Sequence, residues 1–130
     1  VHPALAAPTL IDNGLPGPSP GDVRIFQFAA QTIGGDKITV DWIMTTTGVN
    51  QSNMDEYRMN AATFSFGSTT QEQIVIQGIA QYSSASETLK ADVSTVRAVT
   101  GGTGKYANAS GWMETTHLSD GTWKHVLHLK

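Results

Sequence analysis

Short runs rich in Val, Ile, Thr, Phe and Tyr, separated by turn residues, fill the chain after Asp22. This pattern is typical of an all-β protein. The expected strands cover residues 23–33, 37–47, 61–66, 73–83, 88–100, 106–118 and 122–130. Gly34-Gly35 and Ser119-Asp120-Gly121 predict tight hairpin turns between neighbouring runs. Residues 51–60 are expected to form a helical turn or an excursion, and a split of 88–100 would raise the number of strands from seven to eight.

Alternation along these runs predicts which side chains face the core. In the run 73–83 the inward face is expected to hold Ile74, Ile76, Gly78, Ala80 and Tyr82. In the last run it is expected to hold Trp123, His125, Leu127 and Leu129. The runs 37–47 and 61–66 carry apolar residues on both faces, and the inward positions there are Trp42 with Met44 and Phe64 with Phe66. Each of the first two faces is uncharged and includes one polar group.

Nearly all of the expected strands are joined as hairpins, and no crossover helix is predicted between them. Such a meander closes into a small barrel or folds into a sandwich. A barrel has the advantage that it leaves no edge strand exposed. The pattern therefore favours a single antiparallel β domain, with the barrel and the sandwich both open at this point.

All five prolines lie within the first twenty residues, and three glycines lie within the first twenty-one. Because proline fixes φ and lacks a donor, residues 1–21 are predicted to form an extended arm, with one domain over residues 22–130. The small, apolar stretch of residues 4–8 is typical of a signal-peptide cleavage region. This stretch favours a secreted protein slightly over a cytoplasmic one.

Composition then excludes several kinds of function. The chain has 130 residues, 8 Lys and Arg against 11 Asp and Glu, and no cysteine. Its net charge of −3 argues against a nucleic-acid partner, and no apolar run is long enough to predict membrane insertion. The absence of cysteine excludes disulfides and thiolate chemistry. His117, His125 and His128 suggest no metal site, because His125 and His128 have opposite parity on one strand and no carboxylate stands at ligand spacing.

Residues 97–111 carry a recognisable motif: a strand, a Gly-Gly-Thr-Gly turn, an aromatic residue and a pair of small residues. Two blocks, residues 62–67 and 74–78, precede it in a fixed order. These three blocks resemble the allene oxide cyclase and dirigent superfamily, over roughly residues 57–130. The resemblance implies an eight-stranded antiparallel up-and-down β-barrel with an internal apolar cavity, assembled as a homo-oligomer, either a dimer or a trimer.

The resemblance also implies a kind of chemistry. Plant members cyclise an unsaturated fatty-acid epoxide or direct the radical coupling of phenols, and related microbial barrels fold polyenes into rings, all without a metal or an organic cofactor. What they share is confinement, because holding a flexible molecule in one conformation removes the entropic part of the barrier. This effect contributes up to about 7–11 kcal/mol in favourable cases.

Three polar residues are the catalytic candidates. Gln27 stands where the cyclase branch places an acidic residue inside the cavity, although an amide cannot take a proton as a carboxylate does. The Tyr82 phenol is suited to orienting a carbonyl or epoxide oxygen, and the His125 imidazole to general acid–base catalysis. The expected substrate-binding wall consists of Trp42, Met44, Phe64, Phe66, Ile76, Trp123 and Leu127. Each assignment has a structural alternative. His125 could be a hydrogen-bonded core histidine, Tyr82 an amphipathic tyrosine at the barrel rim, and the wall residues ordinary core packing.

The sequence therefore predicts a cofactor-independent isomerase or cyclase that holds a small, apolar, unsaturated ligand inside the barrel. One alternative is a non-catalytic, dirigent-like protein that binds a small hydrophobic ligand. Another is an interaction domain whose interior is filled by its own side chains. A central cavity distinguishes the first two from the third.

Overall fold

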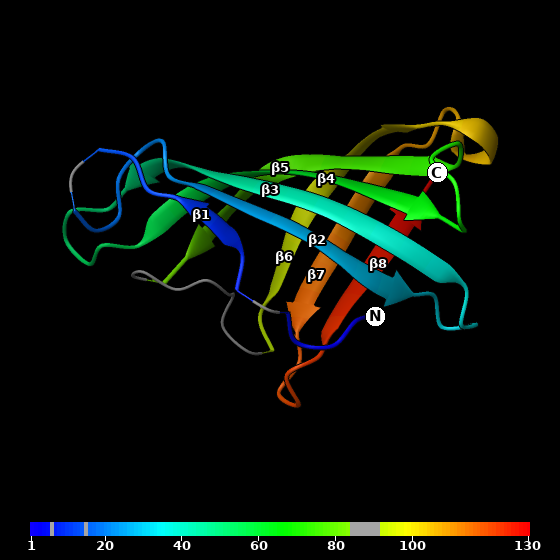
Figure 1. Ribbon diagram of the computed structural model, residues 1–130, viewed down its shortest axis with the longest axis horizontal. Coiled ribbons are helices and arrows are strands. Elements are labelled where there is room, and N and C mark those ends of the chain that lie inside the picture. The colour runs from blue at the N-terminus through cyan, green and yellow to red at the C-terminus, as the bar shows by residue number, and fades with distance from the viewer. Residues whose placement is uncertain (6, 15, 84–91) are drawn as a thin grey trace.

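The computed structural model describes residues 1–5, 7–14, 16–83 and 92–130. In these ranges the chain forms eight strands and one short 3₁₀ turn, η1 (Gly104–Tyr106). The strands are β1 (Thr9–Ile11), β2 (Val23–Gln31), β3 (Lys37–Val49), β4 (Glu56–Phe66), β5 (Gln73–Tyr82), β6 (Ser94–Gly102), β7 (Gly111–His117) and β8 (Trp123–Leu129). Each strand pairs antiparallel with the next, so one sheet has the order β1 to β8 (Figure 1). The prediction of an all-β, eight-stranded antiparallel meander is confirmed.

Two strands differ from the expectation. The strand that raises the number from seven to eight is β1, which comes from residues 1–21 and not from a split of the run 88–100. In that run β6 begins at Ser94, and residues 88–91 lie outside the described ranges. The second difference is β4, which begins at Glu56, so the excursion predicted over residues 51–60 is confined to 51–55 and is wrong for its second half. The reason is that β4 buries Glu56, Arg58 and Asn60, three polar side chains that hide the usual apolar alternation of a strand.

The sheet curls so that its inner face encloses the core. β2 to β5 run along the long axis in Figure 1, and β6 to β8 cross them at a steep angle. Side chains from strands that are not neighbours meet inside: the His125 ring of β8 lies 5.7 Å from Trp42 of β3 and 5.6 Å from Phe64 of β4, measured between ring centroids. The predicted inward positions Ile74, Ile76, Ala80 and Tyr82 of β5 are buried, as expected.

Strand pairing does not close this sheet into the barrel that was predicted. β1 covers only Val23–Ile25 of β2, and no ladder joins β1 to β8 in the described part of the chain. At the other end of β2, Val1 exchanges backbone hydrogen bonds with Gln31, and His2 exchanges them with Trp123 of β8. Two residues of the proline-rich segment thus bridge the gap between β2 and β8, in place of a continuous strand.

None of the described residues form a helix with the length and apolar character needed to cross a membrane.

Candidate ligand-binding site

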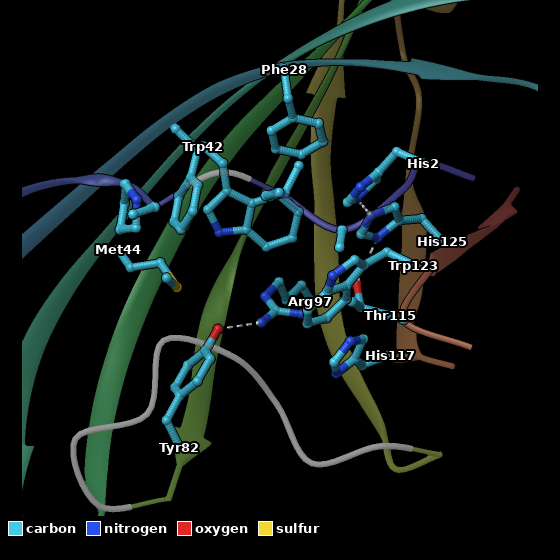
Figure 2. A pocket seen from close by; sticks show the side chains of 16 residues that line it. His2, Phe28, Trp42, Met44, Tyr82, Arg97, Thr115, His117, Trp123 and His125 are labelled. Carbon is cyan, nitrogen blue, oxygen red and sulfur yellow. Dashed lines mark hydrogen bonds between the residues drawn. The ribbon is translucent and has the colours of Figure 1, made fainter. Parts of the chain in front are cut away.

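A pocket of about 400 Å³ opens on the concave face of the sheet (Figure 2). This volume falls in the range of small-molecule sites. Strands β2, β3 and β5 to β8 contribute to its wall, and so does the N-terminal segment through residues such as Leu5 and Pro8. Half of the 16 lining residues are aromatic: Phe26, Phe28, Trp42, Tyr82 and Trp123, with the rings of His2, His117 and His125. Such a wall suits a flat, unsaturated molecule.

Alternation along the strands places the aromatic side chains in the pocket. Phe26 and Phe28 share one face of β2, and Trp42 and Met44 share one face of β3. Phe26 and Trp42 are register partners, so the two strands put their large side chains at one level. The His117 and Trp123 rings stack at 4.3 Å between centroids, where β7 and β8 pair.

Arg97 is the charged group in the pocket wall. One guanidinium nitrogen, Nη2, donates to the Tyr82 hydroxyl at 3.2 Å and to Asn60 Oδ1 at 3.3 Å. The other, Nη1, donates to the Thr95 hydroxyl at 2.9 Å. The guanidinium carbon lies 5.0 Å from the centre of the Trp42 ring, a cation–π contact. Burial lowers the pKa of Arg97, although the Tyr82 hydroxyl opposes this effect.

A buried ionic cluster lies beside this arginine on β2 and β4. Glu56 contacts Arg58 at 2.8 Å and Arg24 at 3.7 Å, and it accepts a hydrogen bond from Thr46 at 2.8 Å. The Arg58 guanidinium in turn lies 4.3 Å from the centre of the Tyr82 ring. Tyr82 is therefore held between two arginines, Arg58 at its ring and Arg97 at its hydroxyl.

A histidine pair forms the opposite wall. His2 and His125 approach each other at 3.0 Å between their Nε2 atoms. His2 Nδ1 lies 2.8 Å from the Pro3 carbonyl oxygen and must donate a hydrogen bond to it. In a neutral His2 the other nitrogen, Nε2, is then the acceptor, and the N–H of His125 Nε2 donates to it. His125 Nδ1 then accepts from the Thr115 hydroxyl at 3.0 Å. Both nitrogens of His125 are occupied by protein groups.

Burial keeps this pair neutral. It lowers the pKa of His2, and it lowers the pKa of His125 to about 3, with the nearby His2 as a further cause. At neutral pH the His125 ring is a hydrogen-bonded, uncharged part of the wall. It is a poor general base in this state, because its only lone pair is already engaged by Thr115.

Five of the residues named from the sequence line the pocket together: Trp42, Met44, Tyr82, Trp123 and His125. Phe64, Phe66, Ile76 and Leu127 belong to the surrounding core, not to the described pocket wall. Phe66 contacts Tyr106, 4.7 Å away between ring centroids.

The position predicted for Gln27 is wrong. Its side chain lies on the outer face of β2, where its amide donates to Asp41 at 2.8 Å. The reason is strand parity: Phe26 and Phe28 turn into the pocket, so the residue between them must point outward. Gln27 therefore has no contact with a ligand in the pocket.

Sequence reasoning missed Arg97, His2 and Asn60. In β6 the apolar alternation Val96-Ala98 suggests the wrong face, since Val96 is exposed and Arg97 is buried. His2 lies far from the rest of the site in the sequence, and only the bridge to Trp123 brings it in. The sequence does hold one indication that Arg97 faces inward. It lies two residues before Val99, on the same face of the strand, and Val99 is buried.

The described residues contain no cluster of three or more His, Asp or Glu side chains that could hold a metal ion.

No known protein family matches this sequence, and no curated protein matches it either. The fold does have solved counterparts. One is the structure of a pyocyanin demethylase, with a TM-score of 0.74 and 22% sequence identity. The alignment covers 99% of this chain and 96% of that one, so the likeness extends over the whole fold. At this level of identity the likeness concerns the fold alone.

Proposed function

We propose that this protein is a small-molecule enzyme that binds a largely apolar, unsaturated molecule in the pocket of the curled sheet. The observation that supports this most is the pocket itself: about 400 Å³ of space with aromatic walls and two polar groups, Tyr82 and Arg97, on one side. Concave, mostly apolar sites with a few fixed polar groups are typical of small-molecule binding.

The similar solved structure supports the same conclusion at a coarse level. That protein is named as a demethylase of pyocyanin, which makes it an enzyme that acts on a small molecule. The likeness does not extend to the reaction, because one fold serves many chemistries and the site decides between them.

For the reaction, we propose an isomerisation or ring closure that is directed by confinement and needs no cofactor. The aromatic walls would hold the substrate in one folded conformation, and the Tyr82 hydroxyl with the Arg97 guanidinium would polarise one of its oxygens. The resemblance to the allene oxide cyclase and dirigent superfamily agrees with this proposal. His125 would act as part of the wall, since both of its nitrogens bind protein groups.

One observation favours a second candidate, a non-catalytic protein that holds a reactive ligand. Because the His125 lone pair is engaged by Thr115, the imidazole offers no free base to a bound substrate. A protein of this kind would shape the ligand while another enzyme or a spontaneous reaction makes the bonds. Binding without any gain in rate would identify it.

The test is a panel of conjugated polyenes, unsaturated epoxides and flat arenes, with binding followed by tryptophan fluorescence and products by chromatography. Trp42 and Trp123 line the pocket, so a bound ligand should quench their emission. Trp112 lies on the outer face and is 42% exposed, and a Trp112→Phe variant should show the same quenching. A complete lack of quenching and of product formation across the panel would contradict the proposed function.

Tyr82→Phe separates the two candidates. It removes the hydroxyl that contacts Arg97 and Asn60 but keeps the ring in place. For an enzyme we expect the rate to fall about tenfold or more, with affinity changed much less. Tyr57→Phe is the matched control, because the Tyr57 ring lies on the outer face of β4 and is 38% exposed. An unchanged rate in Tyr82→Phe would argue against the catalytic role of this hydroxyl.

A further inference from the structure

Arg97 carries a buried charge whose hydrogen-bond partners are all neutral. Its side chain contacts the hydroxyls of Thr95 and Tyr82 and the amide oxygen of Asn60. The residue as a whole is only 2% exposed. A guanidinium removed from water in this way costs free energy unless a negative group compensates it.

The buried carboxylates of the described residues are engaged elsewhere. Glu56 contacts Arg24 and Arg58. Asp22 accepts hydrogen bonds from the backbone N–H groups of Asn13 and Ser19 in the loops before β2. Neither carboxylate forms an ion pair with Arg97, so the protein as described supplies no counter-charge at the pocket.

Donors are also in excess around Arg97. The single oxygen Asn60 Oδ1 lies within hydrogen-bond distance of three of them: Trp42 Nε1 at 2.8 Å, Tyr82 Oη at 3.2 Å and Arg97 Nη2 at 3.3 Å. A carbonyl oxygen has two lone pairs and cannot serve all three donors well. The Nε atom of Arg97 is buried and has no hydrogen-bond partner among the described residues. The floor of the pocket therefore lacks an acceptor.

The neighbours of Arg97 hold it in this position. A Cβ atom at Gly78 of β5 would lie 3.2 Å from Cα, Cβ and Cγ of Arg97, tighter than ordinary contact, so glycine gives the arginine room there. The Trp42 ring supports the guanidinium, and Figure 2 shows the side chain reaching toward Tyr82 across the pocket. These contacts fix Arg97 at the floor of the pocket.

We propose that the ligand of this pocket is a flat, conjugated molecule with an acidic oxygen, and that its anion pairs with Arg97 beside the Tyr82 hydroxyl. This inference rests on the proposed function and specifies its substrate class. The floor of the pocket lacks a negative charge and a hydrogen-bond acceptor. A phenolate, an enolate or a carboxylate supplies both. The aromatic walls would contact the rest of the molecule.

The experiment compares two probes that differ in one ionisable group, 7-hydroxycoumarin and 7-methoxycoumarin, with benzoate as a carboxylate arm. Absorbance distinguishes the phenol of 7-hydroxycoumarin from its phenolate. With the wild-type protein we expect the bound probe to ionise at a lower pH than the free probe, and to bind about tenfold or more tighter than the methoxy analogue once ionised. Benzoate should compete with the phenolate for the same site.

Arg97→Met removes the charge and keeps a long side chain. We expect it to lose the preference for the phenolate over 7-methoxycoumarin, and to keep or raise the melting temperature of the free protein, because an uncompensated charge is gone. Lys124→Met is the control, since it removes an exposed positive charge from the outer face of β8 and should leave the preference intact.

Each outcome decides the inference. Equal affinity for the two coumarins in the wild type would overturn it and leave the proposed function standing, and this comparison does not depend on the variant folding. A retained phenolate preference in Arg97→Met would also overturn it. If neither coumarin nor benzoate binds while members of the polyene, epoxide and arene panel do, the inference is overturned and the proposed function stands. If the panel fails as well, the proposed function fails and the inference falls with it.

Discussion

His125 illustrates how the interior changes the chemistry of a single side chain. An exposed imidazole takes up a proton near neutral pH, but this ring lies between Trp42 and Phe64 and is hydrogen-bonded at both nitrogens. Burial first, and then the nearby His2 and Arg97, lower its pKa to about 3. The neutral form is therefore the native one, and the proton is taken up on unfolding.

This shift predicts a loss of stability in mild acid. In the unfolded chain His125 has its ordinary pKa of 6.5 and is protonated below that pH. In the folded state it stays neutral down to about pH 3. The contribution of His125 to the free energy of unfolding is fully present above pH 6.5. It falls as the pH drops toward 3, by up to about 1.4 kcal/mol per pH unit. Urea unfolding at a series of pH values should show a flatter profile for His125→Gln.

His128→Gln serves as the control for this experiment. His128 lies on β8 with a side chain 38% exposed, and it contacts Glu114 on the outer face. Its replacement should leave the acid-induced loss in place. A His125→Gln profile as steep as that of the wild type would show that other groups cause the loss.

At the level of elements, the glycine-rich turn after β6 is a packing device. A Cβ atom at Gly102 would collide with the carbonyl oxygen of Tyr106 and lie 2.7 Å from that of Gln73, where η1 and β5 approach the end of β6. The neighbouring Gly101 has nothing within 4 Å of its Cβ position. The turn that resembles the superfamily motif thus brings backbones together and does not face the described pocket.

The two glycines give a direct comparison. Gly102→Ala should lower the free energy of unfolding by more than about 1 kcal/mol, because neither carbonyl can move without disturbing the sheet. Gly101→Ala should be close to neutral. Thermal unfolding of the two variants measures the difference, and equal melting temperatures would rule out the close approach as the reason for glycine.

At the level of the whole molecule, the interior holds three arginines, Arg24, Arg58 and Arg97, with Glu56 between the first two. The curled sheet brings these charges from β2, β4 and β6 to one face. Glu56→Gln would leave Arg24 and Arg58 without the carboxylate that joins them, which typically costs about 3–5 kcal/mol. Urea unfolding should therefore show a severe loss of stability.

Glu114→Gln is the matched control for that loss. Its side chain is 40% exposed and pairs with His128, so the change should cost no more than about 1 kcal/mol. A Glu56→Gln protein as stable as Glu114→Gln would mean that the buried cluster contributes little to the fold.

The sequence determined the local features: strands from β-branched and aromatic runs, hairpins at glycine-rich turns, and the inward faces of β5 and of β8 as far as Leu127. These follow from alternation and turn chemistry, which act between near neighbours. Leu129, also expected to face inward, is exposed. Only the tertiary structure decided that Gln27 faces out, that Arg97 faces in, and that His2 meets His125. Those choices depend on partners far away in the sequence, because a buried polar group is stable only where another strand supplies its contacts.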